Sequence, residues 1–141
     1  MLNIKLVLIG IMFALLSGCA SSPEPAQQSQ GNHNWILVSE NTTATFYLDT
    51  NEIAQGEDRV AFLTKVKFFD KQTTAGIDYW SSNVMFLVLT NKNQYGLYET
   101  HLYDKSGNQV HHSPPDENME FSPIKNGAPV QKLYKEALKY L

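Results

Sequence analysis

Val84-Met85-Phe86-Leu87-Val88-Leu89 is an unbroken run of apolar residues, and the polar stretch Asn91-Lys92-Asn93-Gln94 follows it closely. A run this short, bounded by turn-forming residues, is typical of a strand in the middle of a sheet. Residues 95–103 then predict a second strand, and residues 104–108 predict another tight turn, with a positive φ at Gly107. Two successive hairpins predict an antiparallel meander, because no helical crossover separates the strands.

The segments around this centre extend the same pattern. Short β-branched and aromatic runs predict further strands at 35–38, 43–48, 59–69 and 109–112, with a turn at 49–51 and a loop at 71–78. Pro129 suits the first turn of a helix, after which apolar residues recur at spacings of three and four: Val130, Leu133, Tyr134, Ala137, Leu138 and Leu141. The predicted fold is α+β, an antiparallel meander of about six strands with a carboxy-terminal helix packed on it.

The amino-terminal residues have the order of a bacterial export signal. Lys5 supplies positive charge, an apolar run extends from Leu6 to Leu16, and Ser17-Gly18 precede Cys19, the only cysteine of the chain. This order resembles the lipobox of bacterial lipoproteins, which implies cleavage before Cys19 and acylation of that residue. Several acyl chains hold a protein firmly on a membrane, so Cys19 is expected to be the anchor. The simpler alternative is an unmodified cysteine at the end of a signal peptide.

Changes in composition divide the chain into three segments. Residues 1–18 are expected to be the signal peptide, 19–34 the lipidated cysteine with a flexible linker, and 35–141 one folded domain. Ala20 stands where enterobacterial lipoproteins of the inner membrane commonly carry aspartate, which favours the outer membrane. The formal net charge of -3 gives no indication of a nucleic-acid partner.

Four stretches of the domain carry a family resemblance. They are Trp35, the Tyr47-Leu48-Asp49 and Glu52-Ile53 stretch, the run from Tyr98 to Asp104, and Phe121-Ser122-Pro123-Ile124 before the final helix. Together they resemble the surface-adhesin protein E family and cover nearly all of the mature domain. The resemblance implies a lipidated, exported protein with an antiparallel sheet and a carboxy-terminal helix. It brings no catalytic signature.

Two departures from that family concern its disulfide and its binding segment. Members commonly join the late hairpin to the final helix by a disulfide, whereas residues 95–102 and Ala137-Leu138 contain no cysteine. Adhesion in the family is attributed to a basic, tyrosine-bearing strand and hairpin that binds host matrix proteins. Lys92 is the only lysine or arginine in the matching residues 84–103. The fold is therefore carried over to this chain, and the binding of host matrix proteins is not.

Candidate catalytic and metal-binding residues do not form a recognisable set. Ser81-Ser82 lacks the glycines of a nucleophile elbow, and His101 lies in an expected strand. The adjacent pair His111-His112 would point to opposite faces of a strand, so it could chelate one metal only where the strand is broken, with oxygen ligands from residues 116–117. No enzymatic activity, metal site or cofactor is expected.

Residues 84–103 have the composition of an interface, apolar and rich in tyrosine. The candidate partner-binding residues are Tyr95, Tyr98, His101 and Tyr103, and ordinary sheet packing is the alternative. One function class is an outer-membrane lipoprotein that binds a host matrix protein, an envelope-assembly protein or a second copy of itself. The other is a periplasm-facing lipoprotein that binds or hydrolyses a small ligand in a pocket between sheet and helix. A pocket lined by several polar groups would favour the second class.

Overall fold

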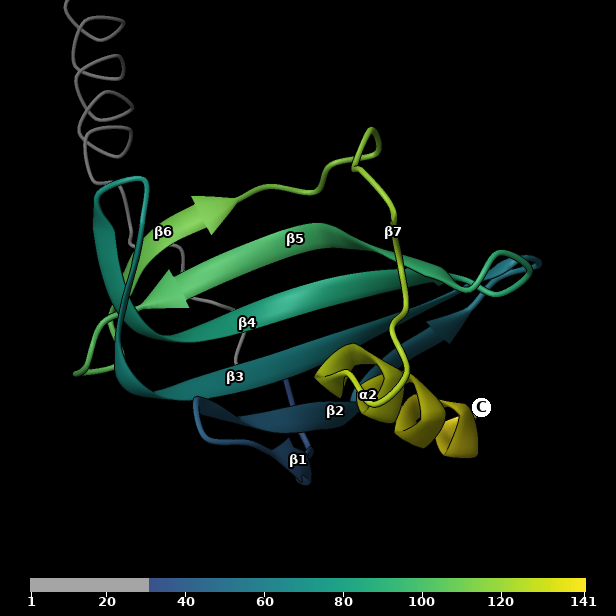
Figure 1. The fold of residues 1–141 in the computed structure, drawn as a ribbon, viewed down its shortest axis with the longest axis horizontal. Coiled ribbons are helices and arrows are strands. Elements are labelled where there is room, and N and C mark those ends of the chain that lie inside the picture. Colours follow the sequence, from purple (N-terminus) through teal and green to yellow (C-terminus); the bar gives the residue numbers. More distant parts are fainter. Residues whose placement is uncertain (1–30) are drawn as a thin grey trace, which may run out of the picture. The chain divides into compact units, whose positions relative to one another are not determined.

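The computed structural model describes residues 31–141, which form one antiparallel sheet and one α-helix (Figure 1). Strands β1 to β6 lie side by side in chain order, and the two-residue strand β7 pairs with β5. The bounds are β1 Trp35–Glu40, β2 Ala44–Gln55, β3 Arg59–Thr74, β4 Ile77–Leu89, β5 Gln94–Tyr103, β6 Gln109–Ser113, β7 Ser122–Pro123 and α2 Pro129–Ala137. The predicted meander with a carboxy-terminal helix is confirmed. Cys19, the expected signal peptide and most of the expected linker lie outside the described residues.

The outer edge of β5 is paired in two places. β6 covers residues 100–103, and β7 covers Gln94 and Tyr95. Between them the Asp116 N–H donates a hydrogen bond of 2.9 Å to the carbonyl oxygen of Tyr98. We call residues 114–124 the strap, because they follow this edge before the chain crosses to α2 (Figure 1). Pro123 suits the outside of the strap, since proline has no N–H to leave unpaired at a sheet edge.

The loop predicted at 71–78 is wrong. β3 continues to Thr74 and β4 begins at Ile77, so a two-residue turn joins them. Ala75 and Gly76 have φ angles of 49° and 78°, the positive values that a hairpin turn matching the strand twist requires. The threonines beside the turn hydrogen-bond across the hairpin, with Thr73 Oγ1 donating to Asp78 Oδ1 over 2.6 Å. The polar composition of residues 71–78 predicted a loop, although these residues form the end of a β-hairpin. The positive φ expected at Gly107 is confirmed at 88°.

The turn predicted at 49–51 is also wrong, because β2 runs through it with a shift of register between Leu48 and Ile53. Asp49 is fully buried at this irregularity. Its Oδ1 accepts hydrogen bonds of 3.0 Å from the N–H groups of Asn34 and Asn51, and its Oδ2 contacts the His33 ring. The contact with Asn51 is the local turn chemistry that the sequence suggested. Asp49 pairs with Trp35 of β1, and β2 pairs with β3 on both sides of the irregularity, at Leu48 and Ile53, so the segment stays in the sheet. The domain's contacts begin before Trp35.

The main hydrophobic core lies between α2 and the first four strands. Its buried members are Leu48, Val60, Phe62, Val88, Ile124, Val130, Leu133 and Ala137. Tyr134 stacks on Phe62 with 6.4 Å between ring centroids. The strap contributes Ile124, which is 6% exposed. Within residues 31–141 no helix combines the length and hydropathy that crossing a membrane requires.

The end of the helix differs from the prediction. Val130, Leu133 and Ala137 are buried as expected, but Leu138 is 43% exposed and Leu141 is 49% exposed. The chain tightens into a 3₁₀ turn at Leu138–Tyr140, which changes the angle between successive side chains. Leu138 and Leu141 are therefore rotated out of the apolar face that they would share in a continued α-helix.

The helix is expected to be held by Leu133. Leu133→Ala should lower the free energy of unfolding by about 2–5 kcal/mol, because it removes a side chain that is 1% exposed. Leu138→Ala is the matched control, and we expect a loss below about 0.5 kcal/mol for this exposed residue. Urea melts of the two variants give both values. Equal losses would show that the helix packs through a different face.

Candidate functional site

The two faces of the sheet are covered differently. α2 packs on one face, whereas a row of directly paired residues crosses all six strands on the other: Leu37, Tyr47, Lys65, Asn83, His101 and His112. Residues paired across neighbouring strands share a face, and none of this row belongs to the core beneath α2. Tyr47, Lys65, Asn83 and His101 are half-buried, and His112 is exposed. We call this side of the sheet the open face.

Lysines lie over aromatic rings at the β1 side of the open face. Lys65 Nζ is 4.3 Å from the ring centroid of Trp35, and Lys67 Nζ is 5.5 Å from that of Tyr47. Partial burial lowers the pKa of Lys65, the charge of Lys67 lowers it further, and the Asp49 carboxylate opposes the shift. Lys65 is half-buried, and its cation–π contact offsets part of the cost of holding that charge away from water. The strand β3 thus adds two cations to the face, whereas residues 84–103 contain Lys92 alone.

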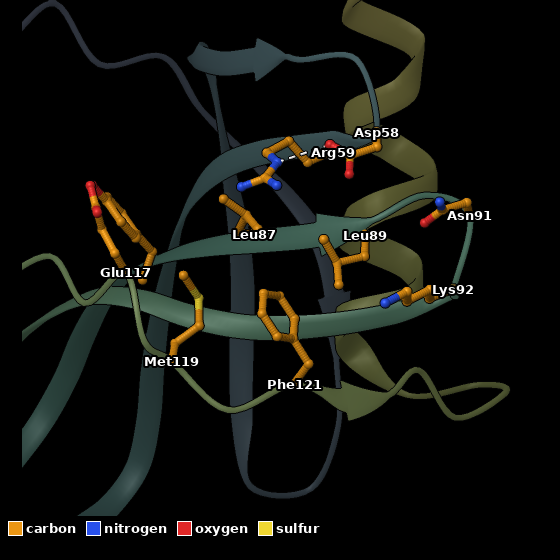
Figure 2. Close-up of a pocket in the computed structure, with 10 residues that line it drawn as sticks. Asp58, Arg59, Leu87, Leu89, Asn91, Lys92, Glu117, Met119 and Phe121 are labelled. Carbon is orange, nitrogen blue, oxygen red and sulfur yellow. Dashed lines mark hydrogen bonds and ion pairs between the residues drawn. The ribbon is translucent and has the colours of Figure 1, made fainter.

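A pocket of about 600 Å³ occupies the opposite end of the open face, near the β4–β5 turn (Figure 2). Its lining residues are Asp58, Arg59, Leu87, Leu89, Asn91, Lys92, Tyr98, Glu117, Met119 and Phe121. Leu87 and Leu89 project from the strand between Arg59 on one side and the strap on the other. Arg59 Nε donates to Asp58 Oδ1 over 3.0 Å, which lowers the pKa of the exposed Asp58 carboxyl. The pocket therefore combines an apolar floor with charges of both signs at its rim.

The strap wall of the pocket depends on Gly96. A Cβ at this position would lie 2.7 Å from both Cγ and Sδ of Met119 and 3.2 Å from the carbonyl oxygen of Glu120. Such distances leave no room for a methyl group, so the glycine lets the strap lie directly against β5. The neighbouring register shift in β5, at Tyr98, places the Tyr98 side chain among the pocket residues.

The structure separates the candidate partner-binding residues into four settings. Tyr98 lines the pocket, and His101 lies in the row across the open face. Tyr95 packs edge-on against Phe86, with 5.8 Å between centroids, and belongs to the shell of the main core. Tyr103 is 8% exposed, and its hydroxyl accepts a 3.4 Å hydrogen bond from Asn83 Nδ2. Burial raises the Tyr103 pKa. Tyr103 is thus buried, whereas Tyr98 and His101 are half-buried on the open face and its pocket.

Arg59 and Phe121 are pocket residues that the sequence did not single out as functional. Arg59 begins β3, and only the register of β3 against β4 places it opposite Leu89. Phe121 carries a weak signal, because it opens the aromatic-x-Pro segment before the helix. No residue of α2 lines this pocket, so it is not the pocket between sheet and helix that the second function class expects.

Glu99, His101 and His112 form a cluster at the β5–β6 side of the open face. Glu99 Oε1 lies 3.1 Å from His101 Nε2 and 2.8 Å from His112 Nε2. The two imidazole rings are stacked, with 4.2 Å between their centroids and 8° between their planes. His111 pairs with Leu102 and contacts Ser113 Oγ at 3.1 Å. The expected opposite directions of His111 and His112 are therefore confirmed, and the partner of His112 is His101.

Comparison with known proteins gives a family and a fold. The sequence model of the family described as surface-adhesin protein E matches residues 35–137. A structure of Haemophilus influenzae protein E is similar over 84% of this chain and 92% of that chain, at 13% identity and a TM-score of 0.52. A crystal structure of protein E from non-typeable Haemophilus influenzae is similar over 83% and 78%, at 15% identity and a TM-score of 0.48. Comparison with curated proteins gave no match.

The packing of Met119 on Gly96 is expected to set the shape of the pocket. Gly96→Ala should lower the free energy of unfolding by about 1–3 kcal/mol, because the new methyl group displaces Met119. Adding Met119→Ala frees the space again. The free energy of unfolding of the double variant should therefore fall by less than the sum of the falls in the two single variants. Urea melts of the four proteins measure this coupling. Additive losses would contradict the contact.

Proposed function

This chain belongs to the surface-adhesin protein E family, and from that membership we propose that it is a non-enzymatic, protein-binding lipoprotein of the outer membrane. In this proposal residues 1–18 are the signal peptide, 19–34 carry the lipid and the linker, and 35–141 are the binding domain. The partner is a host matrix protein or another protein of the cell envelope. The observation that carries the proposal is the open face, where half-exposed aromatic, cationic and apolar side chains adjoin a pocket.

The composition of the open face fits protein recognition. Interfaces are enriched in aromatic residues, methionine and arginine, and Trp35, Tyr47, Tyr98, Met119 and Arg59 all contribute to this face or its pocket. A pocket with an apolar floor can take an anchoring side chain of the partner, which is where binding energy concentrates. The cations Lys65 and Lys67 lie on β3, so the face gains positive charge from a strand outside residues 84–103.

A second candidate function is the binding of a small amphipathic ligand in the same pocket. Its volume of about 600 Å³ lies within the range of ligand sites, roughly 300–1,000 Å³. Asp58, Arg59, Asn91 and Lys92 supply polar groups at the rim. A small ligand would be held by the pocket alone, whereas a protein would also contact the row from Tyr47 to His101. Lys65→Ala therefore separates the two functions, because it should weaken only protein binding.

Tyr98 is expected to be an anchor of the protein interface. Tyr98→Ser should weaken binding of the full-length protein to its partner about tenfold or more, as for a central aromatic residue. Tyr140→Ser is the matched control, because Tyr140 is 49% exposed and lies in the 3₁₀ turn after α2. Surface plasmon resonance against immobilised matrix proteins measures both affinities. Equal effects of the two substitutions would contradict a role for the pocket.

Antibody labelling distinguishes a surface-exposed domain from one that faces the periplasm. Antibodies against the domain should label intact cells if the partner is a host protein. Labelling only after permeabilisation would instead support a partner within the envelope. Sedimentation of the full-length protein in detergent tests whether a second copy is the partner, because a dimer that Tyr98→Ser dissociates would place the self-interface on the open face.

Cys19 is expected to be the membrane anchor. Cys19→Ala should abolish labelling by palmitate and release the protein from the membrane fraction, since the acyl chains supply about 0.8 kcal/mol per buried methylene. Cell fractionation with metabolic labelling makes the measurement. Cys19→Ser is a second variant that keeps the size of the residue and should behave in the same way. A membrane-bound, unlabelled Cys19→Ala protein would overturn the lipid anchor.

A further inference from the structure

We propose that Glu99, His101 and His112 bind a divalent transition metal ion of the Zn²⁺ class. The three side chains come from neighbouring strands: Glu99 and His101 are alternate residues of β5, and His112 is the direct partner of His101 on β6. Their ligand atoms all lie within 4.8 Å of one another. Alternate residues on one strand and a cross-strand partner share a face, so the backbone itself holds the three groups together.

The distances from the carboxylate oxygen to the two ring nitrogens are close to those that the ion needs. Zn²⁺ binds nitrogen and oxygen at about 2.0–2.2 Å, so two tetrahedral ligands are separated by about 3.3 Å. Glu99 Oε1 lies 3.1 Å from His101 Nε2 and 2.8 Å from His112 Nε2. The same oxygen is thus within hydrogen-bonding reach of both ring nitrogens. The two rings are stacked in nearly parallel planes, so each has to turn about its Cβ–Cγ bond before both nitrogens can point at one ion.

The ligand types select the metal. Two imidazole nitrogens and one carboxylate suit Zn²⁺ and its neighbours, whereas Mg²⁺ and Ca²⁺ prefer oxygen ligands alone. His101 Nδ1 lies 2.9 Å from Gln109 Oε1. With Nε2 bound to metal, the Nδ1–H group donates to that oxygen, which fixes the orientation of the ring in the way that outer ligands of zinc sites commonly do.

The site is open to solvent on one side. The side chains of His101, Glu99 and His112 are 22%, 28% and 38% exposed. An ion can enter from the open face, and its fourth position is left for water or for a ligand atom of another molecule. This inference does not depend on the proposed adhesive function, because the three ligands belong to one chain.

Calorimetric titration with ZnCl₂ tests the proposal on the full-length protein in detergent, prepared without a polyhistidine tag. We expect saturable uptake of one ion per chain that excess Mg²⁺ does not displace. His112→Gln and Glu99→Gln should each weaken Zn²⁺ binding about tenfold or more. His111→Gln is the matched control and should leave the affinity unchanged, because His111 points away from the cluster toward Ser113. Thermal melts confirm that each variant is folded.

Two results would overturn the site. The first is an absence of saturable uptake up to about 100 μM Zn²⁺. Any binding would then be weaker than roughly 5.5 kcal/mol, the free energy that corresponds to a Kd of about 100 μM. The second is an equal loss of affinity in His111→Gln, which would mean that exposed histidines bind the ion without a built site. Long-range ¹H–¹⁵N spectra give an independent reading, since Zn²⁺ should shift the Nε2 resonances of His101 and His112 and leave those of His111 in place.

Discussion

The structure depends on how much of the sheet its helix can cover. One nine-residue helix packs on one face of a six-stranded sheet and excludes water from it. Such a helix is about 14 Å long and 10 Å wide, whereas six strands spaced by about 4.8 Å extend over roughly 24 Å. α2 therefore covers β1, β2 and part of β3, and the strap brings Ile124 to extend the core beside Val88. On the other face the strap lies beside the pocket, and no described helix covers the rest, so most side chains there have to tolerate water.

The open face meets that condition with amphipathic side chains. Lys65 and Lys67 hold their ammonium groups over the rings of Trp35 and Tyr47. The histidines and Glu99 satisfy one another across β5 and β6. The pocket at the other end combines leucines with charged residues. Polar groups with local partners therefore share this face with apolar side chains.

Much of the fold could be predicted from short-range patterns. The apolar run at 84–89, the turn after it and the spacing of Val130, Leu133 and Ala137 were sufficient for the meander and its helix. The errors arose where pairing outweighs local preference: polar residues at 71–78 form a hairpin, and Asp49 lies inside a strand. The cluster of Glu99, His101 and His112 was harder to predict from the sequence, because the register between β5 and β6 decides that His112 lies beside Glu99. The alternation Glu99-x-His101 was the one local signal of it.

The helix that covers the first strands is also the last element of the domain to be made. Chains are synthesised from the amino terminus, and each hairpin of a meander can pair as soon as its second strand is present. Leu48 and Phe62 are fully buried in the finished domain. They stay exposed to water until α2 is made and Leu133 packs on that face of the sheet. A chain that ends before residue 129 lacks this cover, and apolar surface left exposed on an unfinished sheet promotes aggregation.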